Sequence, residues 1–304
     1  MLRTQTKKIT AFLSVVAMLF SMLLYFPGGT FSTYSGLKAS AATITPTEPS
    51  TDGDGVYQIG TAAELYWFAG LVNGTLDGVE KNIYANAVLT ANIVVNTGVL
   101  KSDGALADDT SGFISWTPMG KELGRYSGTF NGHGHTISGL FFNDTSIDYV
   151  GLFGYIGYVD DENNNIISTG KLSNVGVVDS YFKGNNCVGG VCGYINAGDK
   201  IENCYNTGNV SGNSNVGGVC GKNYVRITNC YNSGTVSGTG NYVGGVCGYN
   251  VLNLSSGTIE NCYNTGTVSG KGDNVGGVCG NNDRGAITSC YNTGTVSGEG
   301  DNVG

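Results

Sequence analysis

The sequence is constrained most strongly by a six-residue motif, Val-Gly-Gly-Val-Cys-Gly, that recurs about once every 28 residues. A second motif of the form Asn-Cys-Tyr-Asn-Thr-Gly alternates with it. Periods of 20–50 residues indicate a solenoid, a propeller or another repeat array. The first motif starts at Val188, Val216, Val243, Val275 and Val303, and the second occupies 203–208, 229–234, 261–266 and 289–294.

The residue types within each repeat select one kind of solenoid. Short β-favouring stretches such as 226–232 (RITNCYN) and 234–238 (GTVSG) alternate with Gly, Asn and Ser turns. No stretch has the length and 3.6-residue period of a helix, which excludes helical repeats, and a propeller blade needs about 40 residues. Three short strands per repeat suit one coil of a parallel β-helix, in which coils stack about 4.8 Å apart. We therefore predict an all-β parallel β-helix.

Stacked coils turn each recurring residue into a ladder along the axis. We expect the interior to be filled by Val219, Val246 and Val278 or by their cysteine neighbours, since burying a valine contributes roughly 1.5–3 kcal/mol. The Gly pair indicates close backbone packing or a bulge. Strict alternation cannot place both Ile201 and Cys204 inside, so the register stays open. Asparagines are predicted at turns because Asn tolerates positive φ, namely Asn206, Asn232, Asn264 and Asn292.

The first 115 residues differ in character from the repeats. Residues 1–41 read as a bacterial export signal, with basic residues before an apolar run at 9–26 and a small-residue cleavage site at 39–41; an uncleaved anchor is the alternative. We predict a linker at 42–56 and an N-terminal cap segment at 57–115. Within the cap, Thr61 and Glu64 form a capping-box pattern before a helix with Leu65, Phe68 and Val72 on one face. That helix either covers the first coil or packs on a side.

Composition limits the partners. The chain is 40% hydrophobic and 10% aromatic, so it can bury a core. After residue 41 it holds 15 − 4 = 11 Lys and Arg against 23 Asp and Glu, a net charge of −12. A nucleic-acid partner is not expected, because phosphate binding needs clustered basic residues.

The stretches 126–143 (YSGTFNGHGHTISGLFFN) and 149–157 (YVGLFGYIG) resemble the GLUG-repeat proteins of bacteria, whose Gly-Leu-x-Gly signature is here 151–154. The resemblance implies a right-handed parallel β-helix in a secreted or surface-attached protein. It implies first coils at 116–185 and tandem repeats at 186–304, cut off within a repeat. Such repeats also precede the catalytic domain of immunoglobulin-A-cleaving metalloproteases. Their His-Glu-x-x-His zinc motif does not occur in this sequence, whose two histidines are His133 and His135.

Nine cysteines in an exported chain suggest either disulfides or packed thiols. Equivalent Cα atoms in adjacent coils would lie within disulfide range, so both readings stay open. Cys187 has no counterpart in the repeat and takes the place of Asn215 and Asn274. The other eight form two predicted structural ladders, Cys192, Cys220, Cys247 and Cys279 after Val, and Cys204, Cys230, Cys262 and Cys290 before Tyr.

A recurring tyrosine predicts an aromatic ladder that either binds a sugar or protein surface or stabilises the stack. The predicted ladder consists of Tyr205, Tyr231, Tyr263 and Tyr291.

Two other patterns could indicate metal sites, but both favour structural roles. The His133–His135 pair lacks a third ligand for zinc, and Asp273 and Asp301 do not match the pattern of calcium-binding repeats.

Function is predicted only at the level of class. The repeats carry isolated charges such as Glu202, Arg226 and Lys271 and no paired carboxylates for glycoside hydrolysis, so we expect no enzyme activity and no cofactor. The prediction is a secreted or cell-surface stalk or adhesion module, monomeric and not inserted in the membrane after signal cleavage, whose partner is a surface protein or glycan. The alternative is the N-terminal repeat region of a larger surface hydrolase.

Overall fold

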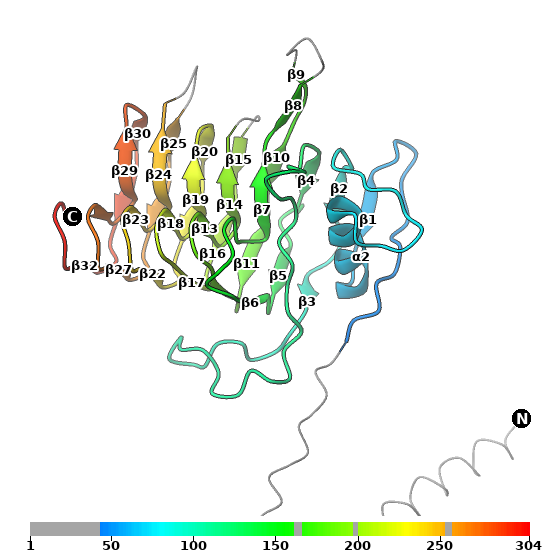
Figure 1. The fold of residues 1–304 in the computed structure, drawn as a ribbon, viewed down its shortest axis with the longest axis horizontal. Coiled ribbons are helices and arrows are strands. Elements are labelled where there is room, and N and C mark those ends of the chain that lie inside the picture. The colour runs from blue at the N-terminus through cyan, green and yellow to red at the C-terminus, as the bar shows by residue number, and fades with distance from the viewer. Residues whose placement is uncertain (1–42, 161–165, 197–199, 253–256) are drawn as a thin grey trace, which may run out of the picture. The chain divides into compact units, whose positions relative to one another are not determined.

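The computed structural model describes residues 43–304 except 161–165, 197–199 and 253–256. The chain winds into a parallel β-solenoid, in which each strand pairs with the equivalent strand of the next coil (Figure 1). Five parallel sheets run along the axis, the longest with eight strands. The predicted all-β parallel β-helix is therefore confirmed. The signal peptide predicted at 1–41 lies outside the described residues.

The strands are grouped by sheet in the order in which one coil visits them. The first sheet contains β1 (Tyr57–Ile59), β2 (Ala87–Leu89), β4 (Thr129–Asn131), β10 (Lys171–Ser173), β15 (Lys200–Glu202), β20 (Arg226–Thr228), β25 (Thr258–Glu260) and β30 (Ala286–Thr288). The second contains β3 (Ile93–Val94), β5 (Thr136–Ser138), β11 (Gly176–Val178), β16 (Tyr205–Asn206), β21 (Tyr231–Asn232), β26 (Tyr263–Asn264) and β31 (Tyr291–Asn292).

The remaining three sheets complete each coil. The third contains β6 (Phe141–Asn143), β12 (Tyr181–Lys183), β17 (Asn209–Gly212), β22 (Val236–Gly238), β27 (Val268–Gly270) and β32 (Val296–Gly298). The fourth contains β13 (Val188–Gly189), β18 (Val216–Gly217), β23 (Val243–Gly244) and β28 (Val275–Gly276). The fifth contains β7 (Phe153–Ile156), β14 (Cys192–Ile195), β19 (Cys220–Asn223), β24 (Cys247–Val251) and β29 (Cys279–Asp283).

A full repeat coil thus has five short strands, so the expectation of three was wrong. Sharp corners explain the difference. Asn203 lies between β15 and β16 with φ 54°, in the left-handed region that asparagine tolerates better than most residues. This corner turns the chain so that Ile201 and Cys204 both point inward and are fully buried. The open register is thereby settled without a bulge.

The same corner corrects the prediction for the second asparagine of the motif. Positive φ falls on the first asparagine of each motif, or on its serine counterpart, and not on the predicted turn residues. Asn206, Asn232 and Asn264 are instead completely buried. The corner residues are Asn203, Asn229, Asn261 and Ser289.

Helix α2 (Ala62–Asn73) lies at the β1 and β2 end of the stack (Figure 1). The predicted capping box is present, since Glu64 N–H donates to Thr61 Oγ1 at 3.3 Å and Thr61 N–H donates to the Glu64 carboxylate at 2.9 Å. The predicted face is buried, and the Phe68 ring lies 6.1 Å from Phe130 in β4 and 6.3 Å from Tyr126. The helix therefore seals the core of the first coils. In the part of the chain that the structure describes, no helix has the length and hydropathy of a membrane span.

The segment predicted as a linker is anchored to this cap. Thr47 N–H donates to Ala63 O at 3.1 Å, Gln58 N–H donates to Ser50 O at 2.8 Å, and Pro49 is buried. The sheets also begin earlier than the predicted first coils, because β1 and β2 already pair in parallel within the cap segment. Coil stacking therefore starts at Tyr57.

One corner of the coil accommodates extra residues. It lies between the fifth sheet and the first sheet of the following coil. In the shortest repeat, β19 ends at Asn223 and β20 starts at Arg226, whereas β24 ends at Val251 and β25 starts only at Thr258. Between β7 and β10 the same corner carries the antiparallel hairpin of β8 (Tyr158–Asp160) and β9 (Ile166–Thr169). The longer repeats therefore differ at this corner and not in the stacked strands.

Candidate functional site

The predicted tyrosine ladder forms on the outer face of the second sheet. Successive rings from Tyr205 to Tyr291 lie 4.7, 4.9 and 5.1 Å apart, with interplanar angles of 3–4°. Tyr205 itself lies over Gly176 of the preceding coil, where a Cβ would collide with the ring. The ring faces therefore cover one another, and only Tyr291, 54% exposed at the last coil, has a free face. Ring edges and hydroxyls face solvent, which suits stabilisation better than stacking of a flat sugar.

Replacing Tyr231 by alanine should cost about 2 kcal/mol of stability, because it removes two ring contacts worth ~0.5–1.5 kcal/mol each beyond burial. Tyr291 has one ring neighbour, so Tyr291→Ala should cost about half as much. Urea unfolding followed by circular dichroism measures both. Equal losses would show that stacking is not the stabilising interaction.

Two asparagine ladders run inside the solenoid and are buried except in the last coil, where Asn292 is half-buried and Asn282 is exposed. In the second sheet, Asn232 Nδ2 donates to Asn264 Oδ1, and Asn264 Nδ2 donates to Asn292 Oδ1, each at 2.8 Å. Each amide also bonds its own turn, as when Asn264 donates to Gly266 O at 2.8 Å and accepts from Gly266 N–H at 3.2 Å. These bonds satisfy a polar group that would be costly to bury alone. The second ladder, in the fifth sheet, consists of Asn223, Asn250 and Asn282.

The Gly pair of the first motif is explained by these ladders. A Cβ at Gly245 would collide with Gly277 O and with the Asn264 side chain. A Cβ at the neighbouring Gly244 would collide with Cys247 O. The pair thus lets the backbone of one side of the coil approach the buried amides of the other, as the close-packing interpretation predicted.

Both predicted cysteine ladders are present, and all nine cysteines are free. Strand register pairs Cys192 with Cys220, and Cys220 with Cys247. Cys204 N–H donates to Cys230 Sγ at 3.4 Å, while the Cys230 thiol donates to Thr228 O at 3.1 Å. This arrangement favours the packed-thiol alternative.

Burial raises the pKa of three of these thiols. It raises the pKa of Cys220 and of Cys230 above the ordinary range. Burial likewise raises the pKa of Cys187 to about 12. Cys187 occupies a positive-φ corner, with φ 56°, that matches the corner at Asn215. A thiol that stays protonated is a poor nucleophile.

Seven of the nine cysteines are buried, so in the folded protein few of them should react with a thiol reagent, and those slowly. After denaturation without reductant, all nine cysteines should react. Ellman's reagent or a maleimide label counts them. A result below two equivalents after denaturation would contradict the packed thiols and indicate disulfides.

A second tyrosine cluster, on the outer face of the fifth sheet, was missed from the sequence. Lys222 Nζ lies 5.1–5.7 Å from the ring centres of Tyr194, Tyr224 and Tyr249, a cation–π arrangement. Tyr155 packs edge-on against Tyr194 at 4.5 Å. The sequence signal for this cluster was the second residue after the cysteine of each Val-Gly-Gly-Val-Cys motif. These residues align in register, and they are Tyr, Lys or Asn in different coils.

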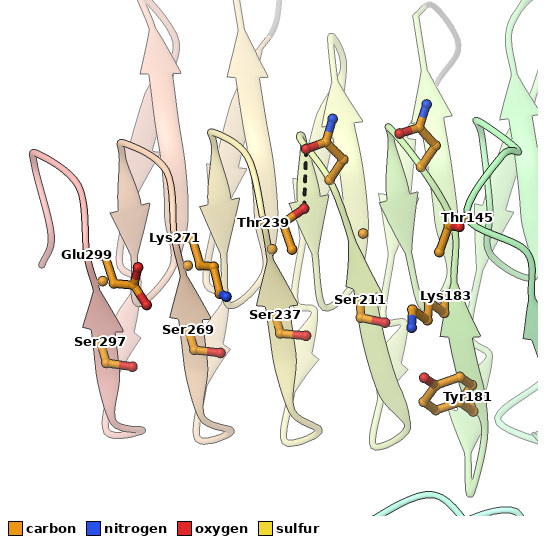
Figure 2. Close-up of a pocket in the computed structure, with 17 residues that line it drawn as sticks. Thr145, Tyr181, Lys183, Ser211, Ser237, Thr239, Ser269, Lys271, Ser297 and Glu299 are labelled. Carbon is orange, nitrogen blue, oxygen red and sulfur yellow. Dashed lines mark hydrogen bonds between the residues drawn. The ribbon is translucent and has the colours of Figure 1, made fainter.

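The structure also contains a groove of about 840 Å³ over the third sheet, which the sequence reading did not predict (Figure 2). A row of serines, one per coil, lies along it. Lys183 lies near one end, and Lys271 and Glu299 lie toward the other. The repeated Thr-Val-Ser-Gly sequence was the available signal, but it was read as strand and turn alone. The row consists of Ser211, Ser237, Ser269 and Ser297.

The minor candidates have local structural partners. His133 is exposed in a turn with φ 50°, and His135 Nδ1 lies 3.3 Å from Asn92 Oδ1. Asp301 N–H donates to the Asp273 carboxylate at 2.9 Å, which ties two successive coils together. Among the described residues, no three His, Cys, Asp or Glu side chains gather as a metal site would require.

The repeats match a known protein family. The family model described as "The GLUG motif" matches residues 184–211, 212–237, 239–269 and 272–297. The chain carries four GLUG motifs. Each GLUG motif spans close to one coil, and strand register aligns Cys192 of the first with Phe153 of the upstream Gly-Leu-x-Gly signature. The predicted resemblance is confirmed for the tandem repeats.

Two other proteins are similar to this chain, one in sequence and one in fold. A protein of Evansella cellulosilytica named "Putative Gly-rich membrane protein" is 48% identical over 42 residues, which are 14% of this chain and 5% of that protein. The chain thus matches a small part of that relative's length. A crystal structure from Bacteroides ovatus, titled as a putative immunoglobulin A1 protease, aligns with a TM-score of 0.58 at 20% identity. The alignment covers 84% of this chain and 80% of that one, and it shows a shared fold.

Proposed function

We propose that this GLUG-repeat chain is a non-catalytic module, secreted or held on a bacterial cell surface, that works as a stiff stalk and presents binding faces to a surface protein or glycan. The observation that carries the proposal is the unbroken parallel pairing of successive coils in the same register. Every coil is fixed to its neighbours by backbone ladders and by stacked side chains. Such a stack resists bending and repeats its outer surface at regular intervals.

The distribution of charge supports a non-catalytic role. The ion pairs are local, such as Lys200–Glu202 at 2.7 Å and Arg284–Asp283 at 3.1 Å. Hydrolysis of glycosides needs two carboxylates about 5–10 Å apart around a substrate, and the groove is lined by one acidic residue, Glu299. The alternative, a repeat region within a larger surface hydrolase, is suggested by the Bacteroides ovatus structure, which is titled as a putative immunoglobulin A1 protease. Sequencing the gene beyond codon 304 separates the two, since a zinc-protease motif there would favour the hydrolase.

Surface placement can be tested with an epitope tag inserted at Gly53, an exposed position where an added side chain meets no neighbour. The tag lies after the predicted cleavage site and should remain on the mature chain. Antibody should label intact bacterial cells or detect the tag in the medium. Labelling that requires lysis of the cells would refute the proposal.

A further inference from the structure

We infer that the groove over the third sheet binds a linear polysaccharide that carries carboxylate groups. The groove follows β12, β17, β22, β27 and β32 (Figure 2). Five coils at about 4.8 Å per step give it a length of about 19 Å, which suits an extended polymer better than a compact small molecule. The inference concerns a site separate from the tyrosine ladder.

Serine hydroxyls line the groove at a constant spacing. Ser237 pairs in register with Ser211 and with Ser269, so the row advances by one coil per hydroxyl. In the part of the chain that the structure describes, Ser237, Ser269 and Ser297 make no side-chain hydrogen bond, and Ser211 makes only a long one of 3.5 Å to Phe182 O. Free hydroxyls can both donate and accept, as recognition of sugar hydroxyls requires.

Glycines next to the serines are required where the chain turns toward the fourth sheet. A Cβ at Gly238 would collide with Val243 Cγ2, and a Cβ at Gly270 would collide with Val275 Cγ2. Both glycines line the groove, so the position directly after each of these serines carries no side chain. The serine hydroxyls thus stay within reach of a ligand lying along the floor.

Charge selects an anionic ligand. Lys183 and Lys271 line the groove, and across the described ranges neither makes an ion pair or a side-chain hydrogen bond. They lie three strand steps apart, about 14 Å along the axis. Glu299, in the coil next to Lys271, also lines the groove, so two lysines face one carboxylate there. The groove is therefore net cationic, whereas the chain as a whole has a net charge of −8. Sugar carboxylates would complement the positive charge of these lysines.

The backbone argues against an extended peptide as the ligand. A peptide that adds to a sheet needs an open strand edge. The strands beneath the groove have neighbours on both sides, as β22 pairs with β17 and with β27. Their N–H and C=O groups are therefore used within the solenoid, and the groove offers side chains alone.

The test uses the purified chain and three probes of equal length, namely an oligogalacturonate, a neutral glucan oligosaccharide and an oligoglutamate peptide. Isothermal titration calorimetry should show binding of the oligogalacturonate, binding of the glucan at least tenfold weaker, and no binding of the peptide. Affinity for the oligogalacturonate should fall with added salt. An absence of oligogalacturonate binding, or equal binding of the oligoglutamate, would overturn the inference.

Variants locate the site. The double change Ser237→Ala and Ser269→Ala should weaken oligogalacturonate binding at least fivefold, and Lys271→Ala should weaken it without affecting the glucan. Ser233→Ala is the matched control, because Ser233 is exposed outside the groove. Thermal midpoints confirm that the variants fold. Unchanged affinity in the double variant would overturn the inference, and because the protein is purified, this result is independent of surface placement.

Discussion

Replacing Asn264 by leucine should lower the free energy of unfolding by about 5 kcal/mol. The change removes four hydrogen bonds inside the solenoid, and each such loss costs about 1–3 kcal/mol. The total is reduced because Asn232 Nδ2 still donates to Gly234 O and Asn292 Oδ1 still accepts from Gly294 N–H. Leucine has nearly the same shape, so the loss would report on polar satisfaction and not on a cavity. Urea unfolding monitored by circular dichroism measures the effect. The four partners are Asn232 Nδ2, Asn292 Oδ1, Gly266 N–H and Gly266 O.

The matched control is Asn143→Leu. Asn143 lies in strand β6 but is exposed, so this change should alter stability by no more than about 0.5 kcal/mol. If Asn264→Leu were as mild as its control, the amide ladder would not be a principal source of stability. The interior would then tolerate apolar columns equally well.

The second large effect is expected from Gly245→Ala. The added methyl group would meet Gly277 O in the next coil and the Asn264 side chain inside the same one. Neither neighbour can withdraw without breaking a ladder, so we expect a loss of about 3 kcal/mol or more. The thermal midpoint and the urea midpoint should both fall.

Gly112→Ala provides the comparison for that change. Gly112 is exposed, has an ordinary φ, and a Cβ there meets no atom within 4 Å. Alanine at this position should be neutral or slightly stabilising, because it restricts the unfolded chain. A similar loss in the two variants would mean that glycine matters here for chain flexibility and not for close approach.

The columns of the solenoid could be predicted from the sequence because parallel stacking converts recurrence along the chain into alignment in space. Val219, Cys220 and Tyr231 each recur once per repeat, and each lies next to its equivalent in the neighbouring coil. The capping box of α2 was equally readable, since Thr61 and Glu64 interact locally. Knowledge of distant contacts was not needed for either feature.

The path of the chain within one coil was harder to predict, because either of the two asparagines in the motif could form the corner. Asn203 takes the left-handed conformation, and this turns Asn206 into the interior. Propensity alone does not separate the two, since both can adopt positive φ. The groove was missed for a related reason, because Ser237 follows Val236 in a strand whose outer face becomes concave only when coils are stacked.

The corner that precedes the first sheet of each coil has a practical consequence. Connections of different length emerge there, from the two residues before β20 to the hairpin of β8 and β9, while the pairing of the flanking strands stays regular. A foreign segment could be grafted at Tyr224 if the residue before β20 keeps accepting the hydrogen bond from Asn223, as Val225 O does here and as Gly257 O does from Asn250 in the longer connection. A protein built in this way can acquire a new loop in each coil and still keep the same scaffold.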